Sequence, residues 1–342
     1  MKAAQLFGPA DLRVVDIPMP EPGPDEAIIR VVRYAPYGTD VGTFLNRGGR
    51  YGSTYPFGIG ADFSGVVELI GADVRNVAVG DRVSALAMDH CGTCRNCRKG
   101  LSNLCLDSAR LNAPRQVCCQ THTLVRANKL ARLPQGVSFD DAAMLSGLVT
   151  VMNGLGMIDP AVDETLGIVG AGAMGWSAIA AAKAMGLTVT VLGGARKRAQ
   201  IARSLGADKL LEISAYDEDL AARLKAETPG GLPCVIETTA TDWGLKQAFA
   251  IAGLGGRIAL LGGGPAPTSG WDLVGRQLTV HGVRAGHHQE MVLDLIAAGR
   301  IDLKPTITHR FGLDDAPKAF ALLTGEDPEA VGRVMIEITD AA

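Results

Sequence analysis

Apolar and polar residues alternate differently in two parts of the chain. Before about residue 146, short apolar runs such as AAQLF, LRVVDIP, AIIRVVRYA and FSGVVELI are broken by Gly, Pro and Asp, which is typical of an irregular, turn-rich β domain. From Thr165 onward, the strand-like runs LGIV, LTVTVL, KLLEI, PCVIETTA, RIALLGG and LTVHGV alternate with helical segments. This alternation predicts an α/β region with a doubly wound parallel sheet. A helix across residues 140–158 is expected to connect the two parts.

A glycine-rich turn, GAGAMG, follows the expected strand Thr165–Val169 and precedes an alanine-rich helix. In a strand-turn-helix setting, the first glycine of GxGxxG permits the tight turn, the second lets the backbone approach a pyrophosphate, and the third lets helix and strand pack closely. The helix N-terminus supplies N–H donors to the phosphates. The turn therefore predicts a dinucleotide site, and a tight turn that binds nothing is the alternative. The residues expected at this site are Gly170, Gly172, Ala173, Met174 and Gly175.

The end of the next strand bears on the choice of cofactor. An NAD-dependent enzyme usually places Asp or Glu about 20 residues beyond the glycines, where it bonds the ribose hydroxyls. Gly193 and Gly194 occupy this point, and Arg196 and Arg198 follow. Because guanidinium groups attract a 2′-phosphate that an acid would repel, we expect NADP(H), with NAD(H) as the alternative. Arg198 is alternatively part of the solvated first turn of the following helix.

Four cysteines are spaced C-x2-C-x2-C-x7-C within a short segment. Thiolates at this spacing suit one tetrahedral Zn²⁺ with no open coordination position, which is a structural rather than a catalytic site. Free surface thiols or a disulfide cluster are the alternatives. The expected ligands are Cys91, Cys94, Cys97 and Cys105. The adjacent Cys118 and Cys119 are expected to be packed or partly exposed thiols rather than a redox pair.

Composition narrows the possible partners. A chain of 342 residues is expected to form about two domains. The formal net charge of −3 and the lack of basic runs argue against nucleic acid or an acidic membrane as partner. The N-terminal segment has no signal-peptide pattern, and the apolar stretches are broken well short of 18 residues. We expect a cytoplasmic enzyme with a small-molecule substrate.

The cysteine quartet, the GAGAMG turn and the phrases FSGVV…GDRV, GLGGRIALLGG and ITHRFGLDDAPKAF occur in the order of one enzyme family. Over nearly its whole length the chain resembles a medium-chain dehydrogenase/reductase of the zinc-containing alcohol dehydrogenase branch that includes sorbitol and threonine dehydrogenases. The resemblance implies a GroES-like catalytic domain formed by residues 1–146 and 284–342, with the zinc lobe at about 88–108. It implies a Rossmann domain at 147–283 and a homodimer or homotetramer.

The chain departs from this family where catalytic zinc is bound. Members with that zinc carry Cys-Gly-Thr/Ser-Asp and Gly-His-Glu, and the matching residues here begin with Tyr37 and have Ala61 at the histidine position. A further ligand, often Glu, corresponds to Ser146, and a histidine that often follows the first motif corresponds to Gly42. Because the thiolate and imidazole ligands are missing, we predict that no catalytic zinc binds.

Hydroxyl and carboxyl groups remain in these motifs. Tyr37 is expected to present its phenol to a substrate oxygen or, alternatively, to fill the space of the metal. The resemblance places Thr39 at a proton-relay position. Asp40 is expected to orient its neighbours. Asp62 is expected to accept a hydrogen bond or relay a proton, or else to be a solvated structural carboxylate.

Three functions are compatible with these residues. The first is an NADP(H)-dependent alcohol dehydrogenase or carbonyl reductase that works without catalytic zinc. The second is an ene-reductase acting on an activated C=C, because one or two hydrogen bonds can hold an enolate oxygen. The third is a non-catalytic cofactor-binding protein. His287 and His288 follow the expected domain junction and either line a cleft or lie on the surface.

Overall fold

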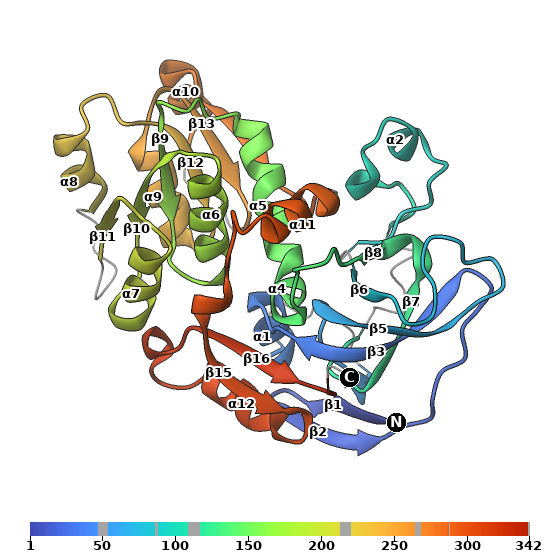
Figure 1. The fold of residues 1–342 in the computed structure, drawn as a ribbon. Coiled ribbons are helices and arrows are strands. Elements are labelled where there is room, and N and C mark those ends of the chain that lie inside the picture. The colour runs from blue at the N-terminus through green and yellow to red at the C-terminus, as the bar shows by residue number, and fades with distance from the viewer. Residues whose placement is uncertain are drawn as a thin grey trace. The chain divides into compact units, whose positions relative to one another are not determined.

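The computed structural model describes residues 1–46, 54–85, 88–108, 117–212, 220–263, 268–286 and 288–340. It divides into two compact units, each discontinuous in sequence (Figure 1). Unit 1 comprises Met1–Ser146, Gln289–Ala298 and Ile307–Ala342, and unit 2 comprises Gly147–His288 and Gly299–Thr306. His287 lies outside the described residues, so the expectation for it has no structural counterpart here.

Unit 1 contains two sheets. The smaller sheet has the order β2-β1-β4 and is antiparallel. The larger sheet has the order β15-β16-β3-β5-β6-β8, with β7 also paired to β3, and only β15 and β16 run parallel to each other. The strands are β1 (Lys2–Gly8), β2 (Asp11–Asp16), β3 (Glu26–Tyr34), β4 (Phe57–Gly58), β5 (Phe63–Ile70), β6 (Arg82–Ala85), β7 (His122–Arg126), β8 (Leu130–Arg132), β15 (Ile307–Gly312) and β16 (Arg333–Glu337).

Short helices complete unit 1. They are α1 (Gly38–Phe44), α2 (Arg95–Arg98), α4 (Phe139–Ala143), α11 (Gln289–Ala297) and α12 (Ala316–Leu323), with 3-10 segments η1 (Ser102–Leu104), η2 (Ala127–Lys129), η4 (Leu313–Asp315) and η5 (Pro328–Ala330). The core of the unit packs fully buried Tyr34 and Phe63 with the aromatic pair Phe44 and Phe320, whose ring centroids lie 5.1 Å apart. Cys118 and Cys119 belong to this core, so the expectation of packed thiols is confirmed.

Unit 2 contains a parallel sheet with the strand order β11-β10-β9-β12-β13-β14. Its strands are β9 (Thr165–Val169), β10 (Thr188–Leu192), β11 (Lys209–Leu211), β12 (Leu232–Glu237), β13 (Ala252–Leu260) and β14 (Thr279–Gly282). Its helices are α5 (Leu145–Ile158), α6 (Ala173–Ala184), α7 (Arg196–Ser204), α8 (Leu220–Glu227), α9 (Asp242–Ile251) and α10 (Gly270–Arg276), with the 3-10 segment η3 (Lys304–Thr306). This order is that of the Rossmann fold, so the predicted α/β class and doubly wound sheet are confirmed.

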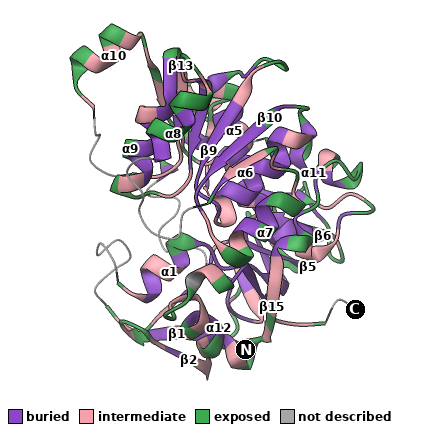
Figure 2. Cartoon of the chain, turned by 90° about the vertical axis from the view of Figure 1, so that its left-hand side faces the viewer, coloured by how far each residue is buried: buried purple, intermediate pink, exposed green. Residues whose placement is uncertain are grey.

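Strands β9 and β10 of unit 2 are buried at every residue except the first, and both are largely purple in Figure 2. Parallel strands covered on both faces are expected to be continuous apolar runs, and Ile168, Val189 and Val235 are fully buried. Helix α9 begins at a Thr241 cap, whose hydroxyl accepts a hydrogen bond from the Gly244 N–H at 3.0 Å.

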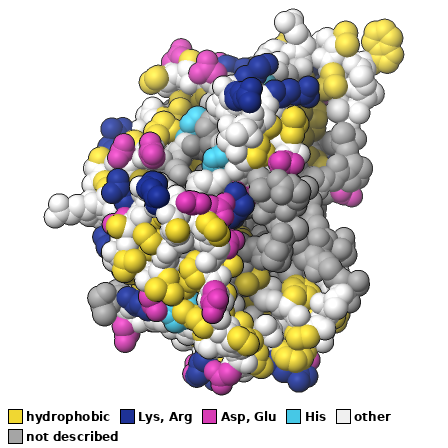
Figure 3. Space-filling model, turned by 90° about the vertical axis from the view of Figure 1, so that its right-hand side faces the viewer, with side chains coloured by type: hydrophobic (Ala, Val, Ile, Leu, Met, Phe, Trp, Pro, Cys, Tyr) yellow, Lys and Arg dark blue, Asp and Glu magenta, His cyan; other side chains and the backbone are white. Residues whose placement is uncertain are grey.

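The outer surface carries charges of both signs. On the face that Figure 3 shows, basic and acidic side chains both occur among apolar ones, so neither sign of charge covers this face alone. Among the described residues, no helix is long and apolar enough to cross a membrane.

The single helix expected across residues 140–158 is wrong in one respect, because the structure has two helices, α4 and α5, that meet at Met144. The Met144 N–H bonds the Asp141 carbonyl at 3.1 Å, which is a tighter turn than an α-helix makes. The Met144 carbonyl accepts a hydrogen bond from the Tyr37 hydroxyl at 3.0 Å.

Candidate metal centre and active-site residues

The four cysteines of the zinc lobe converge. The Sγ atoms of Cys91, Cys94, Cys97 and Cys105 all lie within 4.8 Å of one another. The Cys94 and Cys97 sulfurs are 3.5 Å apart, and those of Cys91 and Cys97 are 4.0 Å apart. Four sulfurs about 2.3 Å from one tetrahedral Zn²⁺ would be separated by about 3.8 Å. The quartet therefore fits a structural zinc ion.

Local hydrogen bonds prepare the sulfurs to carry negative charge. The backbone N–H of Cys94 donates to the Cys91 sulfur at 3.3 Å, and the N–H of Asp107 donates to the Cys105 sulfur at 3.4 Å. A hydrogen bond from the Thr93 hydroxyl, together with those from backbone N–H groups, lowers the pKa of the Cys91 thiol to about 6. Burial, with a hydrogen bond to Cys94, raises the pKa of Cys97 to about 12. A divalent cation at the centre would displace that proton, because metal ligands must be thiolates.

Tyr37 is buried and tethered at the start of α1. Its backbone N–H donates to the Asp40 carboxylate at 2.9 Å, and its hydroxyl donates to the Met144 carbonyl at 3.0 Å. The Arg333 guanidinium lies 5.0 Å from the centroid of the Tyr37 ring, which is cation–π geometry. Both ends of the residue are therefore held, and donation from the phenol to a substrate oxygen would replace its bond to Met144.

The other three residues of the predicted catalytic set differ in exposure. Thr39 is exposed, and its carbonyl accepts a hydrogen bond from the Thr43 hydroxyl at 2.8 Å. Asp40 is 0% exposed and Asp62 is 8% exposed. The alternative of a solvated Asp62 carboxylate is therefore wrong. The segment between β4 and β5 turns inward, and the Asp62 carbonyl accepts from the Ala35 N–H at 3.3 Å.

The two carboxylates share an interior region with other titratable groups. Burial raises the pKa of the Tyr34 phenol, and the charges of Asp40 and Asp62 raise it further. Burial and then the Asp40 charge raise the pKa of the Cys119 thiol in the same way. The Tyr34 phenol and the Cys119 thiol are therefore neutral at physiological pH.

The glycine-rich turn has the geometry that dinucleotide binding requires. Gly170 has φ +109° and donates its N–H to the Leu192 carbonyl of β10 at 2.8 Å. A Cβ at Gly175 would lie 2.0 Å from the Gly170 carbonyl oxygen, so helix and strand approach too closely for a side chain. A Cβ at Gly172 would meet nothing within 4 Å, so the backbone there is open to a ligand. Ala173 and Met174 form the first turn of α6 and are half-buried.

The exit of β10 shows a packing reason for its glycines. Gly193 and Gly194 have φ +121° and +77°, and a Cβ at Gly194 would lie 2.6 Å from the Ala171 Cβ. The backbone conformation and the close packing therefore require glycine here. This reason is separate from the cofactor preference that the missing acid suggests. Arg196 begins α7, is exposed and has φ +46°. Arg198 is half-buried, and its carbonyl accepts from the Trp176 indole at 3.4 Å.

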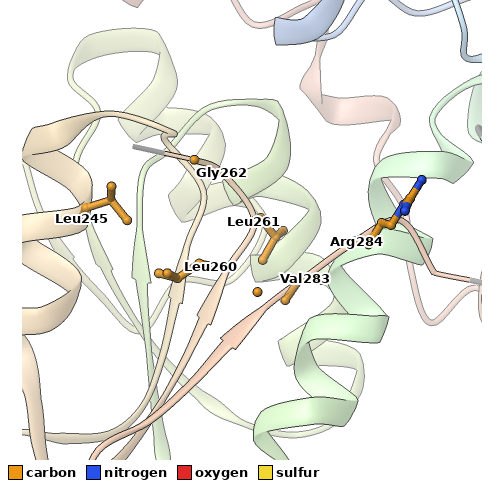
Figure 4. Close-up of a pocket in the computed structure, with 8 residues that line it drawn as sticks. Leu245, Leu260, Leu261, Gly262, Val283 and Arg284 are labelled. Atoms are coloured by element: carbon orange, nitrogen blue, oxygen red, sulfur yellow. The ribbon is translucent and has the colours of Figure 1, made fainter. Parts of the chain in front are cut away.

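A cavity of about 440 Å³ opens at the carboxyl ends of β13 and β14. Among the described residues it is lined by Leu245, Leu260, Leu261, Gly262, Gly263, Gly282, Val283 and Arg284 (Figure 4). Ligands of doubly wound sheets bind outside these strand ends, and a flat ring suits walls of leucine, valine and glycine. No sequence motif marks this cavity, because α9, β13 and β14 contribute to it from separate parts of the chain.

Two residues near these strand ends were not singled out from the sequence. Glu237 ends β12 fully buried, and its carboxylate accepts from the Thr239 N–H at 2.6 Å and the Thr239 hydroxyl at 2.5 Å. Burial raises the pKa of Glu237 despite these bonds. Arg284 is exposed and follows β14 closely. His288 is exposed, which agrees with the surface alternative for this residue.

A four-cysteine centre in one unit and a dinucleotide turn in a Rossmann unit define a nicotinamide-dependent oxidoreductase. Two family models match: alcohol dehydrogenase GroES-like domain over residues 23–135, and zinc-binding dehydrogenase over residues 173–298. An L-threonine 3-dehydrogenase from Deinococcus deserti is 29% identical over 330 residues, which cover 94% of this chain and 95% of that protein.

Solved structures share the fold. An Escherichia coli CFT073 alcohol dehydrogenase complexed with NADH is similar with a TM-score of 0.89 and 24% identity, covering 99% of both chains. A putative zinc-binding dehydrogenase from Sinorhizobium meliloti 1021 bound to NADP has a TM-score of 0.85 and 25% identity, covering 98% of both chains. The chain belongs to the medium-chain, zinc-containing alcohol dehydrogenase family and is an NAD(P)-dependent dehydrogenase related to the threonine dehydrogenases.

Proposed function

We propose that this protein transfers hydride between NADP(H) and an alcohol or carbonyl substrate without a catalytic zinc ion. The observation that supports this most is the buried, tethered phenol of Tyr37 at the position of a family zinc ligand. Ala61 and Ser146 occupy the other ligand positions and offer neither thiolate nor imidazole. Catalytic zinc sites usually combine three protein ligands with strong donor atoms, so this set binds Zn²⁺ poorly.

In this proposal, hydrogen-bond donors replace the Lewis acid. The Tyr37 hydroxyl exchanges its bond to Met144 for one to the substrate oxygen and stabilises the charge that develops there. The exposed Thr39 hydroxyl moves the proton between that oxygen and solvent. The Asp40 carboxylate fixes the Tyr37 backbone through its N–H and so orients the phenol. NADP(H), when bound, supplies or accepts the hydride.

The preference for NADP(H) is supported by the exit of β10. No carboxylate follows that strand at Gly193 and Gly194, and the exposed Arg196 follows two residues later. A charge-assisted, bidentate pair between Arg196 and a 2′-phosphate would favour NADP(H) over NAD(H).

A C=C substrate is a second candidate. Conjugate reduction places negative charge on an enolate oxygen, and the hydroxyls of Tyr37 and Thr39 are enough to hold it.

Relatives named L-threonine 3-dehydrogenase make a 2-amino-3-hydroxy acid the first alcohol to examine.

The test is a set of assays that follow NADPH oxidation with ketones, aldehydes and enones, and NADP⁺ reduction with L-threonine, each with and without a strong chelator. Turnover of ketones or alcohols that survives chelation supports the proposal. Turnover of enones alone supports the ene-reductase, and loss of turnover on chelation contradicts the metal-free mechanism. Binding of NADPH without turnover of any substrate supports the non-catalytic alternative.

We further propose that the protein assembles as a homodimer or homotetramer through the α10 edge of unit 2. β14 is the last described strand of the sheet, and α10 is exposed over much of its surface (Figure 2). Trp271 and Val274 of α10 are 82% and 72% exposed, and Leu254 of β13 is 78% exposed. Trp271→Lys should then yield a smaller particle in light scattering after size exclusion. Val162→Lys, at an equally exposed valine elsewhere in unit 2, should leave the mass unchanged.

A further inference from the structure

The cavity at the ends of β13 and β14 has one charged residue among its described lining residues, which is Arg284. In Figure 4 the side chains of Leu245, Leu260 and Leu261 surround the cavity, and the Arg284 guanidinium points away from them at the rim. An apolar cavity with a single cation at its rim is suited to a ligand that is mostly uncharged and carries one anionic group.

The backbone that carries Arg284 is held firmly. Its carbonyl accepts a hydrogen bond from the Asn153 side chain of α5 at 2.8 Å, and the Val283 N–H bonds the Leu260 carbonyl at 2.9 Å. A Cβ at Gly286 would lie 2.6 Å from the Val149 carbonyl oxygen, so the chain packs directly on α5 just beyond the arginine. The guanidinium is therefore presented from a rigid rim, which favours recognition of a ligand group by orientation.

The phosphates of a dinucleotide do not account for this charge. The glycine turn follows β9, and β12, β13 and β14 lie successively beyond it in the sheet. At about 4.8 Å per strand, the end of β14 is about 14 Å from the end of β9. The pyrophosphate therefore has its donors at the N-terminus of α6, well away from Arg284.

Electrostatics in the cavity favour an anion beside Arg284. If the nicotinamide ring of the proposed cofactor enters this cavity, its oxidised form adds a positive charge near a guanidinium that is always protonated. A substrate carboxylate beside Arg284 would offset this repulsion in the oxidised state, and in the reduced state it would still pair with the guanidinium. The five N–H donors of a guanidinium leave room for a bidentate carboxylate in addition to contacts within the protein.

We infer that Arg284 is a specificity residue that binds the carboxylate of the substrate, so that the enzyme acts on a hydroxy or oxo acid. This inference rests on the proposed function, because it assumes that the cavity receives the nicotinamide. The substrate carboxylate bonds Arg284, and the reacting carbon faces the ring.

The test measures binding of oxamate, an anionic isostere of a 2-oxo acid, and of uncharged oxamide to the full chain saturated with NADPH. The wild type should bind oxamate at least tenfold more tightly than oxamide. Arg284→Gln should remove that difference and leave the dissociation constant of NADPH unchanged, and Arg284→Lys should retain part of it. Lys246→Gln, which removes an exposed positive charge outside the cavity lining, should behave as wild type.

Equal binding of oxamate and oxamide to the wild type would overturn the inference. So would an Arg284→Gln variant that weakens both probes alike or that weakens NADPH instead. Because the readout is binding, these results stay distinct from a failure of the proposed function, which would appear as NADPH binding without turnover in the substrate assays.

Discussion

Two parts of unit 1 use polar side chains in opposite ways. The cysteine quartet gathers its sulfurs within 4.8 Å, and backbone N–H groups point at them, so the ligands are arranged before a metal arrives. The polar groups around Tyr37 instead bond other groups of the protein. The Tyr37 hydroxyl donates to the Met144 carbonyl, and the Asp40 carboxylate accepts from the Tyr37 N–H. One region is built around an ion and the other around internal hydrogen bonds. One domain can therefore hold a group of ligands prearranged for a metal and, in another part of its sequence, a group of polar atoms that bond one another.

The largest effect is expected from breaking the quartet. Cys97→Ser should reduce zinc from about one per chain to none and lower the melting temperature by on the order of 10 °C, because structural zinc contributes folding free energy. Metal analysis and calorimetry measure both. Thr93→Val keeps all four sulfurs and should keep its zinc. Two tightly bound zinc ions in the wild type would contradict the assignment of Tyr37, Ala61 and Ser146.

The next largest effect is expected from a change in the segment around Tyr37. Tyr37→Phe keeps the ring and removes the hydroxyl, and it should lower turnover by on the order of a hundredfold if the phenol holds the substrate oxygen. The bond to Met144 is lost too, at a cost of about 1 kcal/mol in unfolding free energy. Steady-state rates measure the loss of turnover, and thermal melts measure the loss of stability. Unchanged turnover with lowered stability would mean that Tyr37 only fills space and ties Met144.

A smaller effect is expected in the cofactor half. Arg196→Ala should weaken NADPH by roughly tenfold or more, because one charge-assisted interaction is lost, and should leave NADH little affected. Fluorescence titration gives both dissociation constants. Lys197→Ala, at the exposed neighbouring position, is the control and should change neither by more than a few-fold. Equal affinities for the two cofactors in the wild type would refute the NADP(H) preference.

The smallest effect concerns the buried carboxyl of Glu237. Its pKa is raised in the folded state, so the stability linked to its proton is fully present below pH 4.5 and is lost as the pH rises through the folded pKa. Glu237→Gln should therefore become more stable relative to the wild type as the pH rises from 4.5 into the neutral range, which thermal melts at a series of pH values measure. A difference independent of pH would contradict the raised pKa.

Glu227 provides a control of opposite sign. A hydrogen bond and ion pair with Lys209 lower the pKa of this exposed carboxyl. Its contribution is present above pH 4.5 and is lost as the pH falls through the folded pKa. Glu227→Gln should therefore lose a little stability at neutral pH, and that loss should vanish in acid.

The features that the sequence predicted well are those that local chemistry determines. The GAGAMG turn follows a strand with the expected bounds Thr165–Val169, because a parallel strand needs a continuous apolar run and the turn needs its glycines. The cysteine spacing likewise brings four sulfurs together, because α2 and η1 fold the short segment back on itself.

The features that it missed depend on contacts between distant residues. At the break between α4 and α5, the Met144 carbonyl is bonded by Tyr37, 107 residues earlier in the chain. The burial of Asp62 comes from packing of a loop that shows no apolar period. The cavity beside Arg284 collects residues from three elements, and no one of them carries a recognisable pattern.

The pairing of β16 with β3 determines when the larger sheet of unit 1 can be completed during synthesis. This strand pairs with the end of β3 through Tyr34 and Ile336, which are about 300 residues apart in the chain. A ribosome adding roughly 5–20 residues per second makes the whole of unit 2 between these two strands. The end of β3 therefore waits for roughly 15–60 seconds with one edge unpaired, while the nucleotide-binding sheet, continuous from residue 165 to 282, has all its strands. The unit that begins the chain is the last to be completed.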